Sequence, residues 1–150
     1  MMFVLLLTTL IAGTPPTTPT LSPELRALLI EEMKLLEESV NKIPGLLARG
    51  ALYPVAVQAH QMQDSFVLKK KLTPEQRTAL HRQLPAEFIK RDQRFHALAG
   101  KLHDAALAGD AELSAMFFGR LVEACIGCHG DYAAHRFPKL KTQPKAAHHH

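Results

Sequence analysis

The sequence has little of what builds β-sheets, disulfide scaffolds or nucleic-acid interfaces. Its 150 residues include no tryptophan and two cysteines, and aromatic residues make up 6% of the chain. Strand-forming residues are sparse, whereas Leu, Ala, Glu, Lys and Gln dominate the periodic stretches, which favours helices. The formal net charge of +4 is spread along the chain without a dense Lys/Arg stripe. We therefore expect an all-α protein with no nucleic-acid partner.

Charge is also missing from the start of the chain, where no charged residue precedes Glu24. Residues 1–12 form an apolar run that is too short to span a bilayer as a helix. The run resembles the apolar region of a secretory signal peptide with a cut near Ala12 or Gly13, although the usual basic region is missing. A membrane anchor and a misassigned start codon are the alternatives. We expect export to the bacterial periplasm, without stable membrane insertion of the mature chain.

The remaining composition, 47% hydrophobic and 21% charged, is typical of one globular domain. The expected organisation is a signal peptide with a Thr/Pro-rich spacer over 1–22, a folded domain over 23–140 and a flexible tail over 141–150. The tail ends in His148-His149-His150, which is either an expression-tag remnant or a native metal-scavenging segment. Neither reading makes the tail part of the fold.

Four regions of the folded part carry apolar residues at helical spacing. Caps, prolines and glycines punctuate them. The predicted helices cover 23–49, 54 to the Lys69–Lys71 run, 74–108 with a break or kink at Pro85, and about 111–135. Short connections between them predict an antiparallel up-down four-helix bundle.

An enzyme is not expected, because no catalytic constellation stands out. The carboxylates of the first helix, Glu31, Glu32, Glu37 and Glu38, are interpreted as its solvent-exposed face. No Ser/His/Asp order and no Gly-rich phosphate loop accompany them.

The segment Cys125–His129 fits the C-x-x-C-H pattern of covalent haem attachment. One helical turn separates the two sulfurs, so that each can form a thioether with one of two neighbouring vinyl groups. His129 then lies under the iron as an axial ligand. A disulfide at this spacing would be strained, a zinc site needs a second pair of ligands, and thioredoxin-like chemistry needs a βαβ context. We expect one covalent haem c held by Cys125, Cys128 and His129.

The late position of this motif resembles the cytochrome c′ family and its low-spin relatives of the cytochrome c-556 type. Tyr132, three residues past His129, and a first helix with Arg26 and Met33 add to the resemblance, which covers about 23–137. The resemblance implies a haem held inside the bundle from the fourth helix, with its distal face toward the first helix. Homodimers through the first two helices are common in that family.

The sixth iron position decides between two functions. Met33, at one edge of the apolar face of the first helix, is the expected sixth ligand. Matching Arg26 to the family's arginine puts Ile30 there instead, whereas matching the helix end near Arg49 favours Met33. Weaker candidates are Met62, Met116, His60, His81, His96 and His103.

With His129/Met33 ligation, we expect a low-spin electron carrier that exchanges electrons with unidentified redox partner proteins, since such ligation raises the reduction potential. The alternative is a high-spin, five-coordinate cytochrome c′ that binds NO or CO. A helical metal-binding module that uses the His-rich tail is a third reading.

Overall fold

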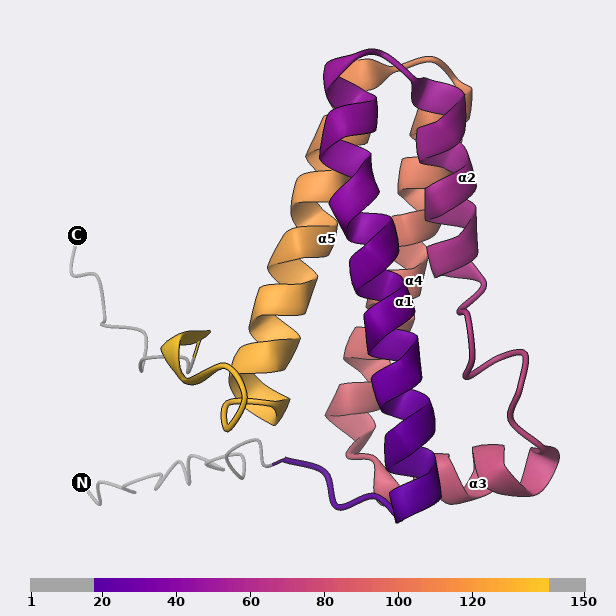
Figure 1. Cartoon of the computed structure of the whole chain (residues 1–150), viewed down its shortest axis with the longest axis vertical. Coiled ribbons are helices and arrows are strands. Elements are labelled where there is room, and N and C mark those ends of the chain that lie inside the picture. Colours follow the sequence, from indigo (N-terminus) through magenta and orange to yellow (C-terminus); the bar gives the residue numbers. More distant parts are fainter. Residues whose placement is uncertain (1–17, 141–150) are drawn as a thin grey trace, which may run out of the picture.

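The computed structural model describes residues 18–140, and this part of the chain contains helices and no strand (Figure 1). The helices are α1 (Pro23–Ala48), α2 (Leu52–Gln63), α3 (Pro74–Gln83), α4 (Ala86–Leu107) and α5 (Ala111–Tyr132), followed by the 3₁₀ turn η1 (Pro138–Leu140). The expected all-α class is thereby confirmed for the described residues. The predicted signal-peptide run and the His-rich tail lie outside them.

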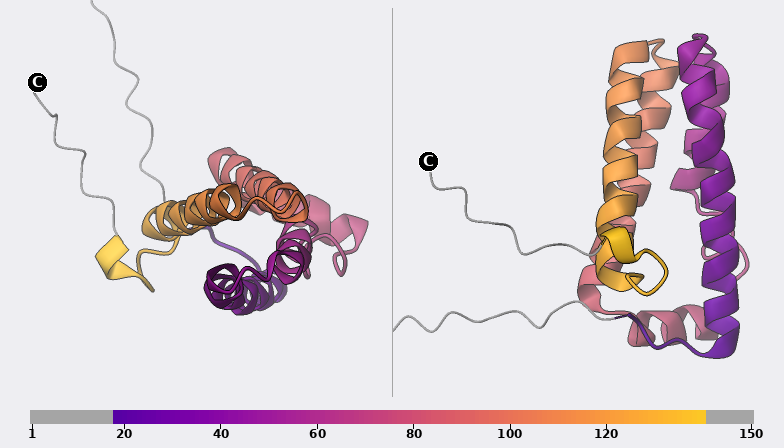
Figure 2. Two further views of the ribbon diagram at one scale, coloured as in Figure 1. Left: turned by 90° about the horizontal axis from the view of Figure 1, so that it is seen from above. Right: turned by 60° about the vertical axis from the view of Figure 1, so that its left-hand side comes forward.

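Four of the helices, α1, α2, α4 and α5, lie side by side, and α3 lies across their lower end in Figure 1. The most extensive packing joins α2 to α4 and α4 to α5, and α1 packs mainly on α2. In Figure 2, seen from above, α1 and α5 stand apart on the side away from the α2–α4 pair. Among residues 18–140, no helix combines the length and the hydropathy that crossing a bilayer requires.

Local sequence signals account for most helix ends. The side chains of Ser22, Thr73 and Asp110 each accept a hydrogen bond from the first turn of the helix that follows, as N-caps do. Gly50 and Gly109, with φ of 70° and 78°, follow the ends of α1 and α4, where a left-handed conformation is easiest for glycine. The predicted starts at these caps are confirmed.

The apolar core has two parts. The larger cluster joins α1, α2, α4 and α5, and its buried members are Ile43, Val55, Ala56, Ala59, Met62, Ala99, Leu102, Ala106 and Leu121. The smaller cluster seats α3 against the start of α1, and its members are Leu21, Leu25, Leu72 and Leu80. Burial of these side chains fixes how the helices pack.

Two expectations about surface charge are corrected. α2 ends at Gln63, so the Lys69–Lys71 run lies in the α2–α3 loop and not at a helix C-terminus. Glu32, expected on the exposed face of α1, is only 1% exposed. Its neighbour Glu31 is at the surface, where its carboxylate accepts a hydrogen bond from Lys71 Nζ at 2.6 Å.

The reason for the burial of Glu32 lies in the loop that follows α2. The backbone N–H groups of Phe66, Val67 and Leu68 donate to its carboxylate, with N···O distances of 2.6–3.1 Å. A buried carboxylate is tolerable only when it is paired or hydrogen-bonded in this way. Glu32 therefore fastens the α2–α3 loop to α1.

Candidate functional site

The two cysteines lie in the last turns of α5, half-buried and with free thiols. Burial raises the pKa of Cys125. Burial also raises the pKa of Cys128 to about 11, against the opposing charge of Arg91. Both groups are therefore neutral thiols at neutral pH. This argues against a reactive dithiol, which depends on a lowered thiol pKa.

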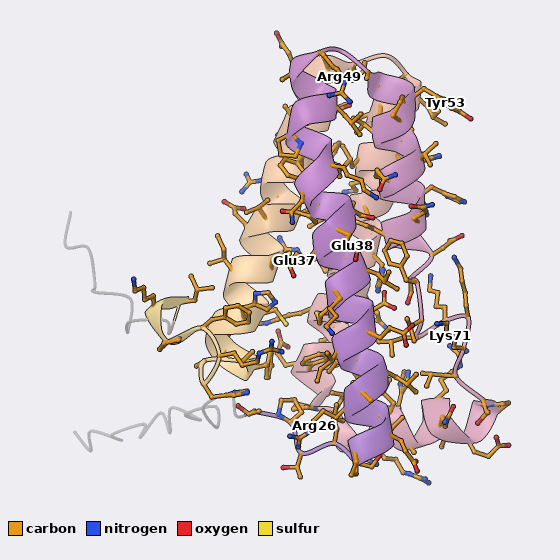
Figure 3. The ribbon with its side chains drawn as sticks, in the orientation of Figure 1. Arg26, Glu37, Glu38, Arg49, Tyr53 and Lys71 are labelled. Carbon is orange, nitrogen blue, oxygen red and sulfur yellow. The ribbon has the colours of Figure 1, made fainter. Side chains whose placement is uncertain are left out.

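His129 follows directly, and its ring is half-buried. Burial and the charge of Arg136 lower the pKa of His129, while Glu37 acts in the opposite direction. The imidazole is therefore neutral near pH 7, which is the form that binds a metal. Figure 3 shows Glu37 on the side of α1 that is turned toward α5.

Met33 lies one helical turn before Glu37, so it shares that side of α1. It is half-buried. Ile30, the alternative from the other register, lies two turns before Glu37 on the same side of α1, and it is 37% exposed. Of the other methionines, Met62 is fully buried in the larger core cluster and Met116 is 48% exposed.

α4 supports the end of α5 through Arg91, to which no pattern in the sequence points. Arg91 Nη1 lies 2.6 Å from the carboxylate of Asp131 and donates to the Gly127 carbonyl at 3.2 Å. Its guanidinium also lies over the ring of Tyr132, 5.5 Å from the centroid. Phe88 adds an edge-on contact to the same ring, at 5.2 Å between centroids. These contacts fix the cysteine-bearing turns of α5 against α4.

The chain then turns back past the end of α5. The ring of Phe137 stacks on the ring of His129, with centroids 4.4 Å apart and planes 9° from parallel. At Gly130, a Cβ would collide with the Leu140 carbonyl. No local pattern in the sequence predicted either contact, because both contacts depend on the path of the C-terminal turn.

The other histidines are not gathered into a site. His96 lies against the Met62 carbonyl at 2.6 Å, and the rings of His60 and His103 lie 5.3 Å apart. Within residues 18–140, no three His, Cys, Asp or Glu side chains come together in a way that could hold a metal ion.

The donor set at the end of α5 suits a haem better than a bare metal ion. Two free thiols lie one turn apart and a neutral imidazole follows them. A Cβ added at Gly127 would meet nothing within 4 Å, so this side of the turn is open. α1 and α5 contact each other little. The residues present thus fit a covalently attached haem.

Comparison of the chain with protein-family models, with curated proteins and with solved structures finds no match.

Proposed function

We propose that this protein is an exported monohaem c-type cytochrome that transfers electrons in the bacterial periplasm. In this proposal the helices form an antiparallel up-down four-helix bundle of the cytochrome c′ and c-556 kind, with haem c attached from α5. The observation that carries the proposal is the set of two free thiols and a neutral imidazole at Cys125–His129, on the helix toward which Glu37 of α1 is turned in Figure 3.

Each residue of this set has one task. Cys125 and Cys128 hold the haem by thioether bonds, and His129 binds the iron through its imidazole. Met33, which lies one turn before Glu37 on α1, would supply its thioether as the second iron ligand. The haem iron supplies one-electron exchange when it is bound, and no substrate is transformed.

The α4 contacts support this function through geometry. Arg91 holds the Gly127 carbonyl and the Asp131 carboxylate, so the attachment turns keep a fixed distance from α4. A fixed ligand framework reduces the reorganisation that accompanies electron transfer.

Haem staining of a denaturing gel tests attachment, because only a thioether-linked haem stays with the unfolded chain. The protein is produced by export in a host that attaches haem c. We expect the wild-type chain to stain and a C125A/C128A variant not to stain. An unstained wild-type chain would refute the proposal.

Optical spectra of the reduced and oxidised protein test the sixth ligand. We expect a sharp low-spin α-band and a weak far-red band of Fe–S(Met) ligation. M33A loses that band, whereas M116A, which removes an exposed methionine of α5, retains it. A high-spin wild-type spectrum that changes on adding NO or CO would instead support the five-coordinate gas-binding cytochrome.

A homodimer through α1 and α2 is part of the proposal. Tyr53 and Val57 lie one turn apart on α2 and are 72% and 38% exposed, and Figure 3 shows Tyr53 directed away from the other helices. We expect Y53A to weaken association. Light scattering that finds only monomers in the wild type would reject the dimer and leave the electron-transfer proposal intact.

A further inference from the structure

The aromatic side chain stacked on the candidate iron ligand comes from outside the attachment motif. Phe137 lies eight residues past His129 in the chain, yet their rings are parallel within 9° and 4.4 Å apart. This is a face-to-face arrangement, which holds two flat rings in a common orientation through dispersion contacts over their whole area.

Backbone contacts, and not burial, bring Phe137 to this place. Its N–H donates to the Ala133 carbonyl at 3.1 Å, and its own carbonyl accepts from Leu140 N–H at 2.9 Å. The Leu140 carbonyl lies against Gly130, where no side chain fits. The C-terminal turn is thus closed on both sides of Phe137 and anchored next to the attachment segment.

The apolar core does not account for Phe137. Its side chain is 36% exposed and belongs to neither core cluster. A half-exposed aromatic ring adds little stability by area burial, compared with a fully buried one. The Arg136 guanidinium lies over this ring at 6.0 Å from the centroid, but the closer contact, at 4.4 Å, is with the face of His129.

Stacking on a face of an imidazole leaves the ring nitrogens at its edge available. An axial histidine binds iron through one such edge nitrogen, with the ring plane roughly perpendicular to the haem. A ring stacked on the imidazole therefore opposes rotation about the iron–nitrogen bond without blocking the bond itself. His129 keeps one orientation as long as the C-terminal turn stays closed.

We propose that Phe137 is a positioning residue for His129, which fixes the plane of the axial imidazole by aromatic stacking. This inference rests on the proposed function, because it assigns Phe137 a role toward a haem-bound His129. In this inference, a residue of the C-terminal turn fixes the plane of the imidazole and thereby influences the electronic symmetry of the haem.

Proton NMR of the oxidised haem protein tests the inference, because the shifts of the haem methyl groups depend on the orientation of the axial imidazole plane. We expect F137A and F137L to change the order and reduce the spread of these resonances. F137Y retains the aromatic face and should keep the wild-type pattern. L113A removes an apolar side chain of similar exposure (39%) from the start of α5, and should also keep it.

Haem staining and far-UV circular dichroism of every variant separate the two proposals. Stained, helical F137A and F137L proteins that keep the wild-type methyl pattern would overturn the role of Phe137 and leave the cytochrome intact. A wild-type pattern in F137L alone would also overturn it, since Leu keeps the apolar contact without stacking. Absence of staining in the wild type would mean that the proposed function fails.

Discussion

The two sides of α5 differ in how they are held. Toward α4, the end of α5 is fixed by the Arg91–Asp131 ion pair at 2.6 Å and by the contact of Phe88 with Tyr132. Toward α1, the contacts are few, and the facing side of α1 carries Met33 and Glu37. The contacts with α4 thus set the position of the attachment turns, whereas the side of α5 toward α1 is only sparsely packed.

α1 is positioned by other means. It packs on α2, and Glu32 fastens it to the α2–α3 loop through three backbone N–H groups. The Glu32 anchor does not involve α5, so it holds this part of α1 independently of α5, although both helices also contribute to the larger core cluster. Two helices of one bundle can thus be kept apart where each of them is fixed to a third element.

Truncation of Leu121 should be the most destabilising change, and it tests whether the core anchors α5. Leu121 is fully buried in the larger cluster, so L121A should lower the free energy of unfolding by about 3 kcal/mol through lost burial and a cavity. L107A, at a site that is 55% exposed, should cost less than about 0.5 kcal/mol. Urea unfolding measures both. Equal costs would show that the core does not hold α5.

Replacement of Glu32 should cost less, and it tests whether this residue anchors α1 to the α2–α3 loop. E32Q should cost about 2 kcal/mol, because a neutral amide replaces a buried carboxylate that accepts from three N–H groups. E31Q removes only a surface ion pair with Lys71 and should cost less than about 0.5 kcal/mol. Chemical denaturation that finds both variants equally stable would contradict the role of the buried carboxylate.

The closed C-terminal turn can be broken at one glycine. G130A should lower stability by about 1–2 kcal/mol, because the new Cβ meets the Leu140 carbonyl. G119A, in the same helix with nothing within 4 Å of the added Cβ, should raise stability by up to about 1 kcal/mol through helix propensity. Thermal unfolding compares the two, and a stabilising G130A would show that the turn does not press on α5.

The smallest effect concerns the contact between α2 and α4. Burial acts to lower the pKa of His96, but the Asp92 carboxylate and the Met62 carbonyl outweigh it, so that the pKa is raised. The protonated ring therefore stabilises the fold fully below about pH 6.5, and this stability is lost as the pH rises through the raised folded-state pKa. H96Q should cost about 1 kcal/mol under acidic conditions and less at alkaline pH.

Urea unfolding over a pH series measures this dependence. H81Q serves as the control, because His81 is an exposed residue of α3. A constant difference between H96Q and the wild type at every pH would mean that the charge of His96 does not contribute.

What could be predicted from the sequence follows from the range of the interactions. The starts at Ser22, Thr73 and Asp110 were predictable, because each cap and its partners lie within one turn. The burial of Glu32 was not, because its partners lie 34–36 residues away. The end of α2 at Gln63 was missed for a related reason. The α2–α3 loop that follows it is held by hydrogen bonds to Glu32, which lies far away in the sequence.

The candidate site divides in the same way. The thiols and the imidazole at Cys125–His129 are contiguous, so spacing alone predicted that they lie together. Arg91 and Phe137 could not be inferred, because helix packing and the path of a turn bring them to the site. Ligation by Met33 stays a prediction that the spectrum of M33A tests.

The hydrogen bonds of Glu32 have a consequence for how the molecule opens. The amides of Phe66, Val67 and Leu68 donate hydrogen bonds to the Glu32 carboxylate, although they lie in a loop. Amide hydrogen exchange at these positions should be slow, and it should quicken only when α1 detaches. The α2–α3 loop and α1 would then unfold as one cooperative unit, so that this loop reports on the attachment of a helix distant from it in sequence.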